Sequence, residues 1–246
     1  MLINCVKYEF SKIIARKKYL FIMVLEIVLV TLLGSLNWQS FDISGTILKF
    51  DLPNLYFNFL PVLSTFLLPV TIFMLVSDTV SLEFENNTIK NIFLRPASRF
   101  NIYLGKNLAI TLYVLINLMI VYLASLVLKV AYTMSFDSVL EGFLAYAITI
   151  IPLFAFVVFC SFVACKVKSS SLTMFLLLIC YLLMAFLSAY SSAIRSVLFV
   201  NYIGYYKFFI GNILPIKYIL NSTLLILSNV LIFFILGYLI FDKRDV

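Results

Sequence analysis

The sequence predicts an all-α integral membrane protein with six transmembrane helices, and two observations carry that prediction. First, 64% of the 246 residues are hydrophobic and only 12% are charged, whereas soluble domains average about 45–50% apolar and about 25% charged residues. Second, six stretches are apolar over the roughly 20 residues that a helix needs to cross a bilayer. Helices are expected because an isolated strand would leave its backbone polar groups unsatisfied in lipid.

The first 18 residues are expected to form an amphipathic helix lying in the membrane surface. Glu9, Lys12, Arg16 and Lys18 lie outside the arc that the apolar residues share. Lysines on the polar side would reach anionic headgroups. The alternative is that the basic residues only anchor the first span. The apolar arc comprises Leu2, Ile3, Val6, Phe10, Ile13 and Ile14.

The remaining residues divide into spans and two long connections within a single transmembrane domain, 1–246. Residues 79–105 form a charged connection. Residues 191–221 are too polar to cross a bilayer and are rich in aromatic residues. That composition predicts short interfacial helices, or a re-entrant hairpin, on the outer side. The predicted spans are 19–36, 57–78, 106–128, 140–164, 172–190 and 222–241.

The distribution of positive charge predicts that both termini and residues 79–105 are cytoplasmic. Thirteen of the 18 Lys and Arg residues lie before the first span, in or beside the connections after the second and fourth spans, or at the C-terminus. Positively charged connections are retained on the cytoplasmic side. Because these residues are spread over separate connections, they do not indicate a nucleic-acid-binding face.

The residue types that most enzymes need are missing. The sequence has no histidine, which removes the commonest general base and metal ligand. Gly105-Lys106 does not complete a phosphate-binding loop, because Phe100 stands where that motif requires glycine. The four cysteines show no metal-ligand spacing. We therefore expect no enzyme activity, no bound cofactor and no metal site in this chain.

Glu26 is an acidic residue near the middle of the first predicted span. Intramembrane acids usually face a bundle interior or a cavity and mark function. Glu26 is therefore a candidate for a translocation pathway. The alternative is a protonated or paired glutamate that only ties helices together.

Residues 79–105 contain an acidic residue, a Thr-Ile-Lys stretch, an apolar pair, Pro-x-Ser-Arg and Gly-Lys. This pattern resembles the signature of type-2 ABC exporter permeases, the transmembrane subunits of ATP-driven exporters. Asn87 stands where the family pattern has glycine, and asparagine shares some of glycine's tolerance for left-handed backbone. The composition is similar to that of Gram-positive bacitracin, lantibiotic and toxin-peptide exporter permeases. The match runs through Glu83, Thr88, Lys90, Ile92, Phe93, Pro96, Ser98, Arg99, Gly105 and Lys106.

The resemblance implies a coupling helix from Leu82 to Leu94, with Ser98 as the N-cap of the next helix. Its apolar side chains would enter a groove of an ATPase subunit, and Glu83, Glu85 and Lys90 would form a polar rim. A solvated charged loop is the alternative. The expected ATPase-coupling residues are Glu83, Phe84, Glu85, Thr88, Ile89, Lys90, Ile92, Phe93, Pro96, Ser98 and Arg99.

The resemblance also implies partners and a location. Two copies of an ABC ATPase subunit would supply the sites for ATP and Mg. The permease would form a homodimer, or pair with a paralogue, among the lipids of a bacterial plasma membrane.

A pathway between two permeases would be lined by the first, second and fifth spans. This lining is apolar and aromatic, which favours an amphipathic peptide or a hydrophobic antimicrobial or toxin. The aromatic residues would otherwise face lipid or neighbouring helices. Other possible functions are export of a lipid or ion by the same architecture, a secondary carrier, and a non-transporting immunity or scaffold protein. The pathway candidates are Glu26, Phe21, Phe66, Phe73, Phe175 and Tyr181, with Phe57, Phe59 and Phe186 in the same spans.

Overall fold

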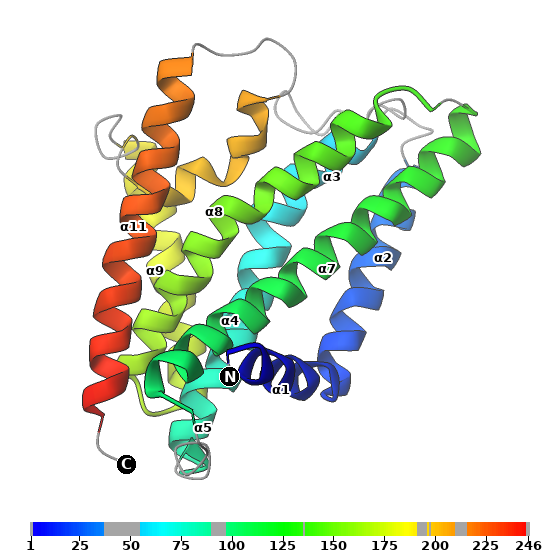
Figure 1. Ribbon diagram of the computed structural model, residues 1–246. Coiled ribbons are helices and arrows are strands. Elements are labelled where there is room, and N and C mark those ends of the chain that lie inside the picture. Colours follow the sequence, from blue (N-terminus) through cyan, green and yellow to red (C-terminus); the bar gives the residue numbers. More distant parts are fainter. Residues whose placement is uncertain are drawn as a thin grey trace.

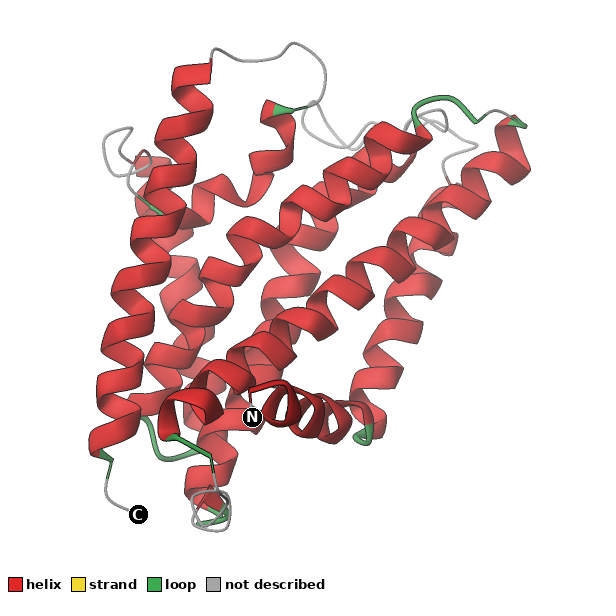
Figure 2. Ribbon diagram, viewed as in Figure 1, coloured by secondary structure: helices red, strands yellow, loops and turns green. Residues whose placement is uncertain are grey.

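The computed structural model describes residues 2–36, 55–89, 97–134, 136–190, 196, 198–209 and 216–244. These residues form helices and short connections, with no strand among them (Figures 1 and 2). The predicted all-α fold is confirmed for this part of the chain. Within these ranges five helices are long and apolar enough to cross a membrane: Tyr56–Glu85, Arg99–Thr133, Val139–Lys166, Ser170–Tyr190 and Ile216–Lys243.

The five helices correspond to the second to sixth predicted spans. The first predicted span, 19–36, corresponds to α2 (Lys17–Leu36), which ends where the described residues end. The long helices lie side by side, and α1 (Leu2–Ile14) runs across one end of the bundle, beside α7 (Arg99–Thr133) and the start of α2 (Figure 1). The predicted single helix over residues 1–18 is wrong, because the chain turns at Ala15 and Arg16 before α2 begins.

The helix Tyr56–Glu85 contains two π-helical segments. It consists of α3 (Leu55–Val62), η2 (Leu63–Leu67), α4 (Leu68–Val76), η3 (Ser77–Ser81) and α5 (Leu82–Glu85). Pro61 lies just before η2 and has no N–H with which to continue the helical ladder. The predicted span 57–78 is too short, since the helix continues for two further turns to Glu85. Single-turn π segments occur frequently at functional sites.

The predicted coupling helix Leu82–Leu94 is wrong in its extent. The α-helix ends at Glu85 and the chain turns through residues 86–88. Asn87 adopts a left-handed conformation with φ 53°, which asparagine tolerates better than most residues. Residues 90–96 lie outside the described part of the chain, and with them Lys90, Ile92, Phe93 and Pro96.

The predicted N-cap at Ser98 is confirmed. The Ser98 hydroxyl accepts a hydrogen bond from the Asn101 backbone N–H at 3.3 Å, and α7 (Arg99–Thr133) begins directly after it. The helix is longer than the predicted span 106–128 because the cap places its first turn before the apolar stretch begins.

The last part of the bundle contains α8 (Val139–Lys166), α9 (Ser170–Tyr190), the 3₁₀-helix η4 (Phe199–Phe208) and α11 (Ile216–Lys243). η4 packs against α8, with Phe199, Ile203 and Tyr206 buried. Of the segment predicted as interfacial or re-entrant, the structure describes 196, 198–209 and the residues from 216 onward. This described part is held against the helix bundle.

Burial differs sharply between helices. Tyr56–Glu85 and α8 are mostly buried, whereas α9 and α11 expose most of their apolar side chains. Phe175, Phe186 and Leu231 are examples. These exposed surfaces are suited to lipid or to a second membrane subunit.

Gly237 marks the closest approach of α11 to its neighbours. A Cβ at this position would overlap the Tyr103 hydroxyl and lie 3.3 Å from the Phe162 Cα. We expect Gly237→Ala to destabilise the fold by about 1–3 kcal/mol through overpacking. Tyr103→Phe should be nearly neutral, because its buried hydroxyl has no hydrogen-bond partner among the described residues.

Thermal unfolding of the purified protein checks this prediction. The double variant Tyr103→Phe/Gly237→Ala should recover part of the loss. The matched control is Gly204→Ala, whose Cβ would meet only the Lys207 side chain at 3.7 Å and beyond. A double variant as unstable as Gly237→Ala would contradict the proposed packing.

Candidate functional site

A cluster of buried charged side chains lies where α1, α5 and α7 meet. Lys106 on α7 is only 1% exposed. Its ammonium group donates hydrogen bonds to Glu9 Oε1 at 2.9 Å and to Glu83 Oε2 at 2.6 Å. The third N–H donates to the Thr79 carbonyl oxygen at 2.9 Å. Lys12 of α1 pairs with the other carboxylate oxygen of Glu83. We call Glu9, Lys12, Glu83 and Lys106 the Lys106 cluster.

The Lys106 cluster contains two positive and two negative side chains, so its formal charges cancel. Burial of a charge costs several kcal/mol unless a partner of opposite charge compensates it. The three N–H donors of the Lys106 ammonium all have acceptors. The buried charges of Glu9, Glu83 and Lys106 are therefore tolerated only because they compensate one another, and the cluster fixes α1 to two other helices.

A glycine allows α1 to approach α7 closely enough for these ion pairs. A Cβ at Gly105 would lie 3.0 Å from the Cys5 Cβ, which is tighter than ordinary contact. Cys5, Glu9 and Ile13 are spaced four residues apart and therefore share one side of α1. Glu9 and Ile13 are buried. The prediction that Glu9 lies on the polar, outward side of α1 is wrong, because Lys106 draws it inward.

A second group of charged residues, the Asp78 cluster, fixes the corner between α1 and α2. Asp78 Oδ2 accepts from Arg16 Nη1 at 2.5 Å and from the Tyr19 hydroxyl at 2.6 Å, and it pairs with Lys18. Tyr113 of α7 in turn donates its hydroxyl to the Tyr19 carbonyl oxygen at 2.9 Å. Asp78, which the sequence places at a span boundary, therefore anchors the N-terminal segment to η3.

The residues after Glu83 contact the other side of the bundle. The Phe84 ring lies 5.9 Å from the Phe241 ring and 4.0 Å from the Arg244 guanidinium carbon. The Glu85 carboxylate accepts from the Ser170 backbone N–H at 2.8 Å. A carboxylate at a helix N-terminus is favourable, since it satisfies a free donor and complements the helix dipole. α5 is therefore in contact with the start of α9 and the end of α11.

Arg244 extends the contact around the end of α11. Its guanidinium donates to the carbonyl oxygens of Cys165 at 2.7 Å and Val167 at 3.1 Å. Partial burial lowers the pKa of Arg244, which nevertheless remains charged at neutral pH. Arg99 at the start of α7 lies 3.8 Å from the Asp242 carboxylate. Both arginines hold the C-terminal end of α11 close to α7 and α8.

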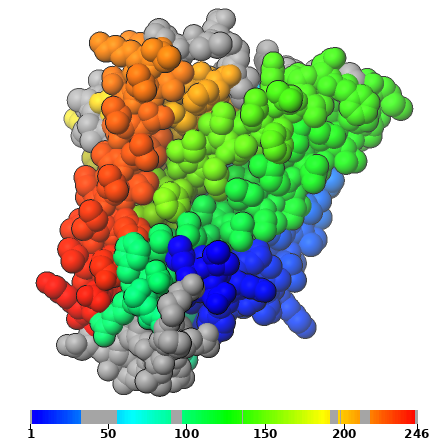
Figure 3. Space-filling model, viewed as in Figure 1, coloured from blue at the N-terminus to red at the C-terminus, as the bar shows by residue number. Residues whose placement is uncertain are grey.

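Several predicted coupling residues are turned inward. Glu83 is 2% exposed and Ile89 is 0% exposed, which contradicts their expected places at a rim and in a partner's groove. The turn of Asn86, Asn87 and Thr88 is exposed, and of the other described coupling residues Glu85, Ser98 and Arg99 are exposed too. Thr88 donates its hydroxyl to the Glu83 carbonyl oxygen at 3.4 Å. The space-filling view shows α1 on the surface at this end of the molecule (Figure 3).

The pathway candidates are not gathered into one site within this chain. Glu26 is fully buried on α2. Phe73 is also buried, 5.6 Å from the Phe156 ring and 6.0 Å from the Tyr181 ring. Phe21, Phe66 and Phe175 are more than 60% exposed on three different elements.

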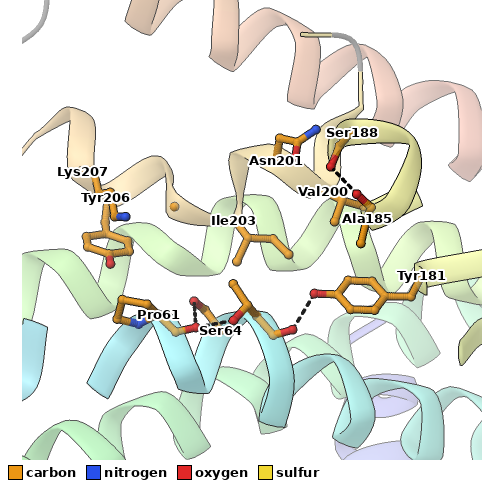
Figure 4. Close-up of a pocket in the computed structure, with 12 residues that line it drawn as sticks. Pro61, Ser64, Tyr181, Ala185, Ser188, Val200, Asn201, Ile203, Tyr206 and Lys207 are labelled. Carbon is orange, nitrogen blue, oxygen red and sulfur yellow. Dashed lines mark hydrogen bonds between the residues drawn. The ribbon is translucent and has the colours of Figure 1, made fainter. Parts of the chain in front are cut away.

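A cavity of about 290 Å³ lies between η2, α9 and η4 (Figure 4). The Tyr181 hydroxyl donates to the Thr65 carbonyl oxygen at 2.5 Å, and the Thr65 hydroxyl donates to the Pro61 carbonyl oxygen at 2.6 Å. Its lining contains both apolar and hydroxyl-bearing side chains, and Lys207 in the lining is exposed. The lining consists of Pro61, Ser64, Thr65, Tyr181, Ala185, Ser188, Val200, Asn201, Ile203, Gly204, Tyr206 and Lys207.

Two features of the sequence, apart from the permease motif, could have indicated the Lys106 cluster. Glu9 is the only acid in the basic first helix. The second feature is Gly105-Lys106. The glycine allows another helix to approach closely, and the neighbouring lysine, lying at the start of an apolar span, needs an acidic partner. Among the described residues no group of three or more acidic or cysteine side chains is placed to hold a metal ion.

A family model described as "ABC-2 family transporter protein" matches residues 5–184. The match runs from α1 into α9, so it includes both charged clusters and the turn at Asn87. A comparison with curated proteins found no match.

Lys106→Met should destabilise the protein by about 3–5 kcal/mol, because it leaves the buried Glu9 and Glu83 without their shared cation. Chemical unfolding of the purified protein in detergent measures the loss. Lys168→Met is the matched control, since Lys168 is exposed and has no ion pair among the described residues. Equal stability of the two variants would show that the cluster does not hold α1 in place.

Proposed function

The chain belongs to the ABC-2 family of transporter proteins and is the membrane permease subunit of an ABC transporter, and on that premise we propose that it docks its ATPase through the turn after α5 and exports an amphipathic cargo. The ATPase subunit supplies the sites for ATP and Mg. The sequence of the permease has no phosphate-binding loop of its own.

The docking surface consists of the turn at Asn86–Thr88 and the residues that follow it. The turn is exposed at the tip of α5, at one end of the helix bundle (Figure 1). Lys90, Ile92 and Phe93 follow directly in the sequence and supply the charge and apolar side chains that a partner groove requires. Glu83 and Ile89 support this surface from inside the permease.

The buried hydrogen bond of 2.6 Å between Glu83 and Lys106 carries the proposal. Movement of the docking turn displaces Glu83, and the Lys106 cluster passes that displacement to α1 and α7. Glu85 and Phe84 pass it to α9 and α11 through Ser170 and Phe241. Packed helices joined by ion pairs shift as units rather than deform.

The docking end is the cytoplasmic end, because the ATPase uses cytosolic ATP and most basic residues lie at this end. Both termini are then cytoplasmic in a bacterial plasma membrane. Two permeases, identical or paralogous, enclose the pathway and each binds one ATPase. The exposed apolar surfaces of α9 and α11 are available for the second permease and for lipid.

The cargo is an amphipathic peptide of the antimicrobial or toxin class. The cavity between η2, α9 and η4 supports this class, since it combines apolar side chains with hydroxyl groups and Lys207. Phe21, Phe66 and Phe175 add exposed aromatic surface on the spans that would face a second permease.

Phe93→Asp should abolish binding of the ATPase, because it places an unpaired charge in an apolar groove. Glu83→Gln should leave binding intact and lower transport, because it weakens the link to Lys106. Co-purification and vesicle transport assays separate the two effects. The matched control is Phe136→Asp, at the exposed connection between α7 and α8 at the other end of the bundle. Retention of the ATPase by the Phe93 variant would remove the docking proposal.

Amphipathic peptides should stimulate ATP hydrolysis by the reconstituted transporter more than lipids or sodium do. The reason is that an apolar, hydroxyl-bearing lining contacts both sides of such a peptide. ATPase activity in vesicles, with the three cargo classes tested side by side, measures this. Stimulation by lipid or sodium alone would contradict the peptide cargo and leave the docking proposal standing.

A further inference from the structure

Glu26 and Asn117 form a buried polar pair between α2 and α7. Both side chains are 0% exposed, and the two helices pack against each other. Asn117 lies beside Glu26. Although the Asn117 amide is within interaction range of Glu26, neither carboxyl oxygen of Glu26 and neither polar atom of the Asn117 amide makes a well-formed hydrogen bond to another described residue. Unpartnered buried polar atoms are uncommon in native proteins and call for an explanation.

Among the described residues no positive charge forms an ion pair with Glu26. Near the N-terminal end of α2, Lys12 pairs with Glu83, and Arg16 and Lys18 pair with Asp78. Lys7 and Lys17 are exposed, whereas Glu26 is fully buried. The titratable group that faces Glu26 from α7 is Tyr113, whose hydroxyl proton is donated to the Tyr19 carbonyl oxygen. An ionised carboxylate in this place would be desolvated without a counter-ion, which is among the most costly arrangements in a membrane helix.

We propose that Glu26 is a proton-binding site, which holds a proton while α2 and α7 are packed together. A protonated carboxyl group has one O–H donor and one carbonyl acceptor, and the Asn117 amide has the complementary acceptor and donors. An ionised carboxylate offers only acceptors and leaves the Asn117 Oδ1 unpaired. The neutral form therefore suits its neighbour and its surroundings.

A metal cation would find too few ligands between these helices. Hard cations such as Ca²⁺ take six or more oxygen ligands. The side-chain oxygens on this pair are the two of Glu26 and one of Asn117, and the nearby Tyr113 hydroxyl is already bound to Tyr19. A proton needs a single acceptor, so it is the ligand that the pair fits.

Proton binding links pH to the packing of α2 on α7. The packed arrangement binds the proton, and an arrangement that exposes Glu26 to water releases it. By mass action the packed arrangement is favoured at acidic pH and loses stability as pH rises. A cycle that separates the two helices therefore takes up and releases a proton at Glu26. This inference does not depend on the proposed ATPase docking or cargo.

Infrared spectroscopy of the full chain in lipid vesicles at neutral pH tests the proposal. The wild type should show the C=O stretching band of a protonated carboxyl group, and Glu26→Gln should lose it. Glu141→Gln is the matched control, because Glu141 is exposed on α8 and should not contribute to the band. A band that survives in Glu26→Gln overturns the proposal.

Thermal unfolding provides an independent readout. The melting temperature of the wild type should fall from about pH 5 to about pH 9 more steeply than that of Glu26→Gln. If sodium at alkaline pH stabilises the wild type but not Glu26→Gln, the site binds a cation and the proposal is wrong.

If Glu26→Gln does not fold, Asn117→Leu takes its place in the infrared experiment. The C=O stretching band of the protonated carboxyl group must remain but shift in frequency, and an unshifted band overturns the pairing of Glu26 with Asn117.

Discussion

Lys106 is held inside the protein by two carboxylates from distant parts of the chain, Glu9 of α1 and Glu83 of α5. Such a cation is stable in the interior only while both anions stay in place. That requirement fixes where α1 lies and how closely it approaches α7 at Gly105. It also requires the helix Tyr56–Glu85 to continue as far as Glu83. The position of the exposed turn at Asn87 follows from the same constraint, because Glu83 is buried one turn before it.

Much of the fold follows from the sequence. Apolar stretches locate the centres of the spans, although several helix ends lie five to seven residues beyond the predicted bounds. Ser98 predicts the start of α7, and Asn87 marks a left-handed turn. The full length of the helix Tyr56–Glu85 and the burial of Glu9 do not follow from the sequence. A hydropathy profile ends a predicted span where charged residues begin. A charge remains in a buried helix when its partner is nearby in space. Glu9 and Lys106 are 97 residues apart, so a periodicity argument along one helix does not reveal the pair.

The sequence predicts where in the chain the candidate site lies, but not which of its residues are exposed. The motif around Glu83–Arg99 includes the exposed turn at residues 86–88. Glu83 and Ile89, on either side of that turn, are buried and support it from inside. The helix Tyr56–Glu85 has one π-helical segment beside the cavity at Tyr181 and another beside the Lys106 and Asp78 clusters. Its regular part, α4, joins the two places. Because the helix is continuous, a displacement of the turn at Asn86–Thr88 would be passed along it to the cavity.

We propose that the turn at Asn86–Thr88 and α1 move together because the Lys106 cluster joins them. Distances between spin labels, measured in the assembled transporter with and without ATP, test it most directly. Labels at Lys7 of α1 and Asn86 of the turn, both exposed, should keep one distance in every nucleotide state. The distance from Asn86 to Phe136 at the other end of the bundle should change. A Lys7–Asn86 distance that changes as much as the Asn86–Phe136 distance would contradict the account.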